Sequence, residues 1–504
     1  MNKYISKIKL LVLASTMLAA CTKLDEQTFG SLSPDNFYRT EKEGLSSVVG
    51  VYSLLSQVVH IGDPWRISEF GTDEFVVPGR ASGGWFDQNQ IDIIQHKAKP
   101  DNGRAAQAWV NIFQEIGTAN AVLESLEKSP NAANLKGLIA ETRALRAYGY
   151  FYAMDLWGNV PLVTTARIEP ANLPKTNSRK EVFDFVTSQM LKAADDLPSV
   201  KTVQKTAYYP RFTKEAVYAA LATVYLNGQV YTGTAYWDKA IEMADKVIST
   251  GAYKLEKDVV DNFRSTNEDK STELISSFSV DATKNAGGNQ FILYAQHSLD
   301  QKKYNLPFIP ANGYSTGQEA LDRYEDRDNR KSLIEYGPQT YLDGTPLRYP
   351  NGQQLILVPV KDLVGAEDNE GYHVLKYTPV GAKWAGFNGD NDLVLMRYSD
   401  ILLIKAEAQF RTGKVAEALG LVNDVRARSN ASALTSLTLK NIEDERAREF
   451  IWEGHRRRDM IRFGTYFTGT WKFKTTVTEP WRAIYPIPAA QINANPNLVQ
   501  NPNY

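Results

Sequence analysis

The chain has 504 residues, of which 43% are hydrophobic and 23% are charged, and its formal net charge at pH 7 is −1. A charge so close to zero gives no electrostatic reason to expect nucleic acid as a partner. The single cysteine, Cys21, excludes a disulfide within the chain, and the apolar content is sufficient for a large core.

The first 20 residues have the pattern of a secretory signal peptide. Three lysines precede a short apolar run from Leu10 to Leu18, and Leu-Ala-Ala ends just before Cys21. This run is too short to span a bilayer, which needs about 20 residues, although an uncleaved signal anchor is the alternative. The stretch resembles the lipobox of bacterial lipoproteins. That resemblance implies cleavage before Cys21, lipid attachment to Cys21 as the membrane anchor, and a lipidated tether over residues 21–34.

Helical periodicity recurs along most of the chain. In the first predicted helix, which begins near residue 35, Val48, Val51 and Leu55 fall on one face at helical spacing. Further helices are predicted over 104–127, 135–157, 180–197, 211–227, 236–250, 391–412, 414–429 and 441–463.

Three stretches lack this periodicity. Residues 60–100 carry glycines and prolines among aromatic residues, which indicates a loop-rich segment. Between 251 and 390, short apolar runs alternate with clusters of Gly, Asn, Asp and Pro, which predicts short strands and turns. The tail from Tyr485 to Tyr504 is rich in Asn and Pro, and we expect it to lie extended over the helices.

Two pairs of predicted helices are alike. Residues 211–227 pair with 236–250, and residues 393–412 pair with 415–428, where small residues surround a tight turn. Small residues let antiparallel helices approach closely, as they do in tetratricopeptide-type pairs. A plain helical hairpin is the alternative.

Six segments in chain order resemble the SusD/RagB family of outer-membrane nutrient-binding lipoproteins. They are "SPDNFYRTEKEGLSSVVGVYSLL", "LRAYGYFYAMDLWGNVPLV", "RFTKEAVYAALATVYLNGQ" with "YWDKAIEMADKVISTGAYKL", "LMRYSDILLIKAEAQFRTGKVAEALGLVNDVRARSN", "IEDERAREFIWEGHRRRDMIRFG" and "YPIPAAQINANPNLVQNPNY".

This resemblance implies a mostly α fold, in which a tetratricopeptide-like helical repeat scaffold carries an inserted, irregular, loop-rich subdomain. Residues 35–250 would form the N-terminal helical region with a ligand loop at 60–100. Residues 251–390 would form the inserted ligand-binding subdomain, and 391–504 the C-terminal repeat helices and tail. The implied function is capture of glycan at the surface of the outer membrane and delivery to a SusC-like TonB-dependent transporter, with neither catalysis nor cofactor.

The segment "GTDEFVVPGRASGGWFDQNQ" is the candidate ligand site, and it resembles a pattern found in part of the family, except that Gly84 replaces an Asp before the Trp. An aromatic ring can stack on the C–H face of a sugar while neighbouring polar groups bind its hydroxyls. The alternative is that the aromatic residues only pin the loop to the helices. The predicted ligand-binding residues are Trp85, Asp87, Asp73, Arg80, Phe86 and Tyr314.

Other charged and metal-binding patterns favour structural roles. Glu445, Arg446, Glu449 and their neighbours are spaced for ion pairs along one helix, which is typical of a paired or solvated face. The five histidines show no zinc spacing. Acidic stretches near Asp326 and Asp390 lack the calcium-loop pattern, so no metal is predicted, with a structural calcium ion as the alternative.

Two other functions remain as alternatives. A surface glycoside hydrolase would need two carboxylates about 5 to 9.5 Å apart, and the sequence contains no recognised hydrolase motif. A scaffold that only docks proteins, in uptake of peptide or another nutrient, is the second, because helical repeats often serve this purpose.

Overall fold

The computed structural model describes residues 38, 40–265, 271–282 and 288–504. The predicted signal peptide, Cys21 and the tether at 21–34 lie outside these residues. The described chain is mainly helical, and its strands are short and joined in two-stranded pairs. The predicted mostly α fold is therefore confirmed.

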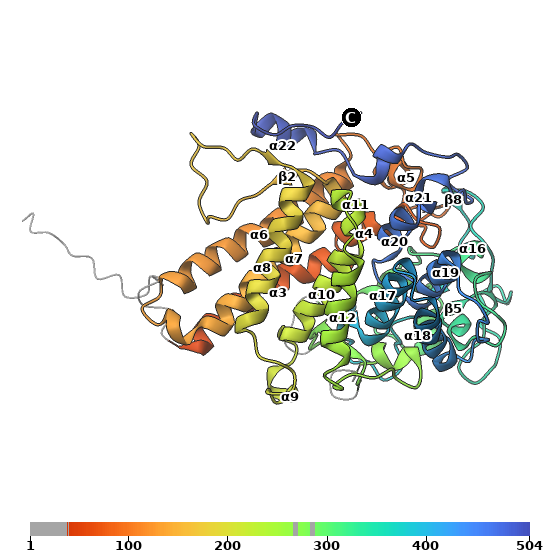
Figure 1. Cartoon of the computed structure of the whole chain (residues 1–504). Helices are drawn as coiled ribbons and strands as arrows, with labels where there is room; N and C mark the ends of the chain where they lie inside the picture. Colours follow the sequence, from red (N-terminus) through yellow and green to blue (C-terminus); the bar gives the residue numbers. More distant parts are fainter. Residues whose placement is uncertain (1–37, 39, 266–270, 283–287) are drawn as a thin grey trace, which may run out of the picture.

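The long helices pack side by side in a row that Figure 1 shows in sequence colours from orange through green to blue. In chain order they are α3 (Glu41–Val59), α6 (Gly103–Lys128), α7 (Lys136–Trp157), α8 (Arg179–Asp196), α10 (Lys214–Leu226), α12 (Trp237–Ile248), α17 (Tyr398–Arg411) and α18 (Val415–Arg428). From α6 to α18 each of these helices contacts the next. Helix α12 packs on α17 although about 150 residues separate them, so the intervening chain is an insertion in the helical row.

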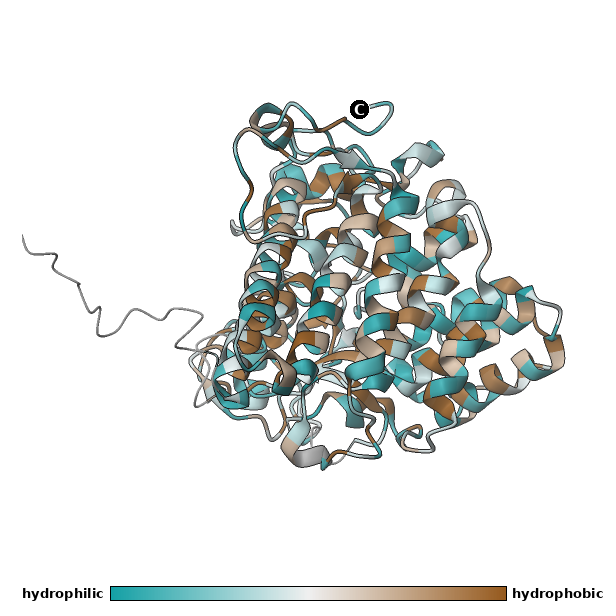
Figure 2. Ribbon diagram, turned by 60° about the vertical axis from the view of Figure 1, so that its left-hand side comes forward, coloured by the Kyte–Doolittle hydropathy of each residue, from teal (hydrophilic) through white to brown (hydrophobic). Residues whose placement is uncertain are grey.

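Local sequence explains where these helices begin and which face they bury. Thr40 and Ser178 form capping boxes at the starts of α3 and α8, which satisfies backbone N–H groups that have no partner within the helix. In α7 every residue from Ala140 to Trp157 is buried, as expected for a central helix. Other helices are amphipathic, and Figure 2 shows hydrophilic and hydrophobic residues alternating along their ribbons.

Short elements connect and decorate the row. Before the insertion they are α4 (Asp63–Phe70), β1 (Gly79–Arg80), α5 (Gln88–Ile94), η1 (Ala132–Asn134), β2 (Val160–Pro161), β3 (Thr176–Asn177), α9 (Lys205–Tyr208) and α11 (Gly228–Thr232). After it they are α19 (Leu439–Glu449), α20 (Arg456–Phe463), α21 (Thr465–Thr468), η4 (Pro480–Ala483) and α22 (Ala489–Ala494).

The insertion consists of short helices and strands, as the sequence predicted. Its longest strand, β4 (Leu274–Phe278), pairs antiparallel with β12 (Leu393–Arg397). The remaining elements are η2 (Val259–Phe263), α14 (Phe291–Ala295), α15 (Asp300–Tyr304), α16 (Gln318–Leu321), η3 (Asn329–Leu333), β5 (Ile334–Glu335), β6 (Gly337–Pro338), β7 (Ile356–Leu357), β8 (Val364–Ala366), β9 (His373–Val374), β10 (Trp384–Ala385) and β11 (Asn388–Gly389).

Three sequence-based boundaries were wrong. The segment predicted as one helix over 391–412 begins with strand β12, because pairing with β4 holds these residues extended. The predicted loop at 60–100 contains the short helices α4 and α5. The predicted helix over 441–463 is divided into α19 and α20 by a turn in which Trp452 has φ 59° and Gly454 has φ 78°.

Buried carboxylates hold that turn in place. Glu74 accepts a hydrogen bond from the backbone N–H of Trp452 at 3.0 Å. Glu69 accepts one from the N–H of Gly454 at 2.7 Å. The break in the helix therefore depends on residues almost 400 positions earlier in the chain, which periodicity within the helix does not reveal.

The charged residues of α19 and the turn after it form a buried network with partners largely from other segments, whereas the spacing predicted a paired or solvated face along one helix. Glu449 accepts hydrogen bonds from Arg330 (3.0 Å), Arg397 (2.8 Å) and Arg428 (2.5 Å). The side chains of Glu449 and Arg330 are fully buried. Because Arg330 comes from the insertion and Arg428 from α18, the network joins the insertion to the helical row.

The C-terminal tail lies over the end of α7, as predicted, and α22 is its one short helix among the described residues. The N–H of Tyr485 donates to Leu156 O at 2.7 Å. The side-chain amide of Asn501 donates to Trp157 O and Tyr485 O, both at 2.8 Å.

Candidate functional site

The predicted ligand loop has an unusual backbone at its tip. Gly83, Gly84 and Trp85 have φ values of 97°, 88° and 62°. Glycine adopts positive φ easily, but for a bulky residue such as tryptophan this conformation is a true outlier. The turn is closed by a hydrogen bond from Arg80 N–H to Gly84 O at 3.1 Å. Strained residues of this kind concentrate at functional sites, where the surrounding structure holds them in place.

The indole of Trp85 packs on three residues of the insertion, Tyr294, Ala311 and Gly313, which together form its seat. Its Nε1–H donates to Ala311 O at 2.7 Å. The ring packs edge-on against Tyr294, with centroids 5.6 Å apart. It also covers Gly313, where an added Cβ would lie 2.3 Å from the indole atom Cζ2. Trp85 remains partly exposed, so this seat fixes its orientation without hiding it.

Phe86, the next residue, has 59% of its surface exposed. It lies beside Gly79 in β1, where an added Cβ would approach the Phe86 backbone to 3.2 Å. Strand β1 pairs in parallel with β8, whose Val364 is 57% exposed. Trp85 and Phe86 therefore place aromatic surface at the edge where the loop meets the insertion.

Arg80 and Tyr314 support this loop from within the protein. The Arg80 guanidinium donates to the backbone oxygens of Asn312 (2.9 Å) and Glu370 (2.5 Å), and burial lowers the pKa of Arg80 to about 10. Tyr314 is 1% exposed, and its hydroxyl accepts from Arg66 Nε at 2.8 Å. Neither residue presents a polar group to a ligand in this structure, so their positions favour a supporting role over the predicted ligand contact.

Asp73 and Asp87 are each bound by arginine. Asp73 lies 2.6 Å from Arg323 and 2.7 Å from Arg456. Burial alone would raise the pKa of Asp73, but the two arginines hold it well below its usual range. Asp87 caps α5 and accepts from Arg104 Nε at 2.7 Å. Of the six predicted residues, Phe86 is exposed and Trp85 is partly exposed, while the polar groups of the other four are engaged within the protein.

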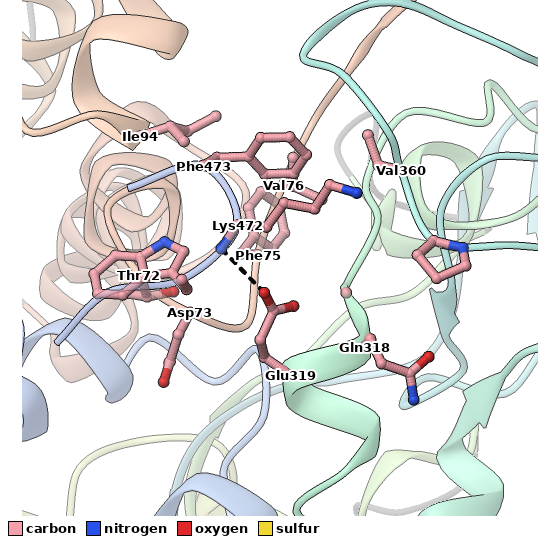
Figure 3. A pocket seen from close by; sticks show the side chains of 13 residues that line it. Thr72, Asp73, Phe75, Val76, Ile94, Gln318, Glu319, Val360, Lys472 and Phe473 are labelled. Atoms are coloured by element: carbon pink, nitrogen blue, oxygen red, sulfur yellow. Dashed lines mark hydrogen bonds between the residues drawn. The ribbon is translucent and has the colours of Figure 1, made fainter. Parts of the chain in front are cut away.

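A pocket of about 230 Å³ borders Asp73 (Figure 3). Buried Phe75, Val76 and Ile94 contribute apolar surface to it. Glu319 lies at its edge and accepts a hydrogen bond from the N–H of Lys472 at 3.0 Å, drawn as a dashed line in Figure 3. The segment that supplies Lys472 gave no signal as a site in the sequence, because it lies far from the predicted loop and carries no recognisable motif.

An aromatic cluster connects this pocket to the Trp85 loop. The ring of Phe75 lies 5.0 Å from that of Tyr314, and Tyr314 lies 5.9 Å from Trp85 between ring centroids. The predicted loop and the buried Tyr314 therefore lie close together. The contribution of Tyr294, Ala311 and Gly313 was missed, because short apolar runs in an irregular segment do not indicate which residues face a distant loop.

No group of three or more His, Cys, Asp or Glu side chains within 40–265, 271–282 and 288–504 is arranged to hold a metal ion. Near Asp326, where an acidic stretch raised the alternative of calcium, the carboxylate lies 2.7 Å from Lys331 Nζ. The structural calcium ion remains an untested alternative.

Two family models match the chain. The SusD family matches residues 228–504, and a family described as "Starch-binding associating with outer membrane" matches residues 41–226. Among curated relatives, the starch-binding protein SusD of Bacteroides thetaiotaomicron is 27% identical, with 87% of this chain and 85% of the relative covered. SusD-like protein P38 of Formosa agariphila is 24% identical, with 100% and 99% covered.

Solved structures show the same fold. Surface glycan-binding protein A from Bacteroides thetaiotaomicron, in complex with laminarihexaose, aligns with a TM-score of 0.75 at 22% identity, covering 92% of this chain and 99% of that one. A laminarin-binding SusD-like protein aligns with a TM-score of 0.74 at 22% identity, covering 93% and 100%.

Proposed function

This chain belongs to the SusD family, and from that premise we propose that it binds glycan at the surface of the outer membrane. We further propose that it delivers this glycan to a SusC-like TonB-dependent transporter without catalysis, and that lipid on Cys21 anchors it. Several acyl chains contribute about 0.8 kcal/mol per buried CH2, which makes such an anchor stable.

The observation that supports glycan binding most directly is the conformation of the Trp85 loop. A tryptophan held at φ 62° costs on the order of 1–3 kcal/mol, and packing alone does not require this cost at a partly exposed position. The seat on Gly313 and Ala311 orients the indole before any ligand arrives. A rigid ring of this kind stacks on a sugar at low entropic cost.

The charge states of Asp73 and Asp87 argue against a role for these two predicted residues as the acid of a hydrolase. A glycosidase needs one carboxyl group that stays protonated so that it can act as an acid. Burial alone would raise the pKa of Asp87, but hydrogen bonds from Arg104 and Asn89 lower it. Asp73 is likewise held ionised by Arg323 and Arg456. Neither predicted site carboxylate is suited to donate a proton.

Binding of soluble protein lacking residues 1–21 to a polysaccharide panel tests the proposal. The panel includes starch and laminarin, because the descriptions of relatives name these glycans. We expect Trp85→Ala to weaken binding at least about tenfold, or 1.4 kcal/mol, and Phe86→Ala to weaken it less. Tyr218→Ala removes a partly exposed aromatic ring from α10 and serves as the matched control.

Each outcome has a distinct meaning. Equal glycan affinity of the Trp85→Ala and parent proteins would refute the Trp85 site. Turnover of labelled oligosaccharide by the pure protein would favour the hydrolase. Absence of all glycan binding, together with copurification of a transporter, would favour the protein-docking scaffold.

A further inference from the structure

A second pocket, of about 450 Å³, opens on the helical row between α6, α7, α8 and the loop after β2. It is far from the Trp85 loop. Arg104, near the start of α6, contacts Asp87, whereas Glu124 of the same helix lines this pocket. At about 1.5 Å per residue, the twenty residues between them span about 30 Å. The pocket is therefore a separate site and no extension of the candidate glycan surface.

Positive charge dominates the lining of this pocket. It contains four cationic side chains, Arg143, Arg146, Arg167 and Lys192, and two carboxylates, Glu124 and Glu127, an excess of 4 − 2 = +2. Both carboxylates are already paired: Glu127 lies 3.0 Å from Arg143, and Glu124 lies 2.5 Å from Lys128. Arg167 in turn lies 3.2 Å from Glu169, which is outside the lining. The side chain of Lys192, which is exposed, has no hydrogen-bond or ion-pair partner among the residues that the structure describes.

Arg146 is the buried cation of this lining that forms no ion pair among the described residues. It is 7% exposed and donates to two neutral groups, Asn120 Oδ1 at 2.8 Å and Gln189 Oε1 at 2.9 Å. Its Nε has no hydrogen-bond partner among the described residues. Burial lowers the pKa of Arg146, because a guanidinium removed from water without an anion in contact is costly.

The buried acid Glu115, which interacts electrostatically with Arg146, does not relieve this cost. Neither carboxyl oxygen of Glu115 has a hydrogen-bond partner among the described residues. Burial raises the pKa of Glu115 well above its usual value, against the opposing effect of Arg146. Because neither oxygen of Glu115 hydrogen-bonds to Arg146, the guanidinium has no carboxylate in contact and its charge is available to an incoming anion.

The site is also fixed in shape. Asn120, which accepts from Arg146, donates through Nδ2 to Val163 O at 2.9 Å. The hydroxyl of Tyr150 donates to the same oxygen at 2.8 Å. These bonds hold the start of the loop that supplies Thr164, Thr165 and Arg167 to the pocket wall. Arg146 is thus held in place before a ligand binds, whereas Arg167 and Lys192 are exposed at the rim of the pocket.

We propose that this pocket binds the carboxylate or sulfate group of an acidic sugar unit. Arginine forks match the geometry of such oxyanions. Thr164, Thr165 and Gln189 provide hydrogen-bonding groups for sugar hydroxyls. Leu123 is the one large apolar side chain among the described residues of the lining, so an acyl chain finds little surface here. This inference rests on the proposed glycan-binding function and adds selection for acidic glycans.

The test is calorimetric titration of the soluble protein with trigalacturonate, with sodium sulfate, and with vesicles of phosphatidylglycerol. We expect trigalacturonate to bind and its affinity to fall as salt is raised, because exposed charges are screened. Arg146→Gln keeps hydrogen-bonding capacity but removes the charge, and we expect it to weaken binding at least tenfold. Lys192→Ala, an exposed change that spares the core, should weaken binding severalfold.

Lys180→Ala removes an exposed cation at the other end of α8, where Lys180 pairs with Asp184, and should leave the affinity unchanged. Thermal unfolding of each variant identifies any loss of fold, and the Lys192→Ala result stands if Arg146→Gln is unstable. Failure of both trigalacturonate and sulfate to bind, or equal binding by the Arg146→Gln, Lys192→Ala and parent proteins, would overturn the inference. Vesicle binding that these two changes abolish, without trigalacturonate binding, would assign the pocket to lipid phosphate and also overturn it.

A neutral glycan that binds in the polysaccharide panel allows this inference to be tested separately from the proposed function. Retained affinity for that glycan in the Arg146→Gln and Lys192→Ala proteins, together with lost trigalacturonate affinity, would support two independent sites. If no neutral glycan binds to the parent or to the variants, the proposal of a Trp85 site is refuted, and the trigalacturonate result still tests the proposal for this pocket.

Discussion

Gly313→Ala displaces the Trp85 indole without removing an aromatic residue. An ideal Cβ on residue 313 would lie 2.3 Å, 2.4 Å and 2.7 Å from three atoms of the indole. Comfortable carbon contacts begin at about 3.5 Å, so the ring must move by about 1 Å or more. Such a shift lengthens the hydrogen bond from Trp85 Nε1 to Ala311 O, which is 2.7 Å in the structure.

The expected cost combines two effects. Overpacking costs about 1–3 kcal/mol, and the weakened hydrogen bond adds about 0.5–1.5 kcal/mol. If about 2 kcal/mol of this is lost from ligand binding, glycan affinity falls about 30-fold. The measurement is glycan affinity by titration, with the indole fluorescence and near-ultraviolet circular dichroism of the free protein reporting on the position of the ring.

Gly117→Ala in α6 is the matched control, because an added Cβ there meets no atom within 4 Å. We expect this change to stabilise the helix by up to about 1 kcal/mol and to leave glycan affinity unaltered. The reasoning would be refuted if Gly313→Ala bound glycan as tightly as the parent while Trp85→Ala did not, because the orientation of the indole would then be irrelevant.

Three further predictions concern the buried charges. Glu449→Ala should destabilise the protein by about 3–5 kcal/mol, because three arginines lose their shared carboxylate. The loss would appear as a lower denaturation midpoint, and a midpoint equal to that of the parent would contradict the prediction. Burial alone would raise the pKa of Glu453, but Arg397 and Lys376 hold that pKa at about 2. The stabilising contribution of the ionised Glu453 is therefore present above about pH 5 and is lost as the pH falls toward 2. In Glu453→Gln the free energy of unfolding should depend less on pH between about 5 and 2. Burial raises the pKa of Glu74 to about 7, so the protonated form is favoured in the folded protein and stability is lost as the pH rises toward 7. If the free energy of unfolding of Glu74→Gln changed with pH between about 5 and 7 as it does in the parent, this prediction would be excluded.

The buried network explains why charged residues crowd α19 and the turn that follows. Arg397 bonds to Glu273 at 2.7 Å and to Glu449 at 2.8 Å, and therefore connects β12 to the neighbouring strand region and to α19. Removal of one charged side chain from such a network leaves its partners buried without a counter-charge, and a single substitution is therefore strongly destabilising. Three-residue and four-residue spacings in the sequence suggested ion pairs within one helix, but most of the actual partners come from distant segments.

The candidate site was only partly predictable. The Gly-Gly-Trp sequence indicated a loop with an aromatic residue at its tip, and the structure places Trp85 there with Phe86 exposed beside it. The residue types of Arg80 and Tyr314 suited a sugar site equally well, yet both are buried. Residue type alone does not distinguish a group that binds ligand from one that holds the loop, because either role uses hydrogen bonds.

The sequence by itself determined most of the long helices, because apolar spacing, capping residues and glycine stops act over a few residues. It also determined membership in the family through ordered motifs along the whole chain. Only the tertiary structure decided the break between α19 and α20, the seat of Trp85 on Gly313 and the cationic pocket around Arg146. Each of these depends on contacts between segments far apart in the chain. A local sequence pattern does not indicate which distant side chain will form the hydrogen bond or ion pair that a buried polar group needs.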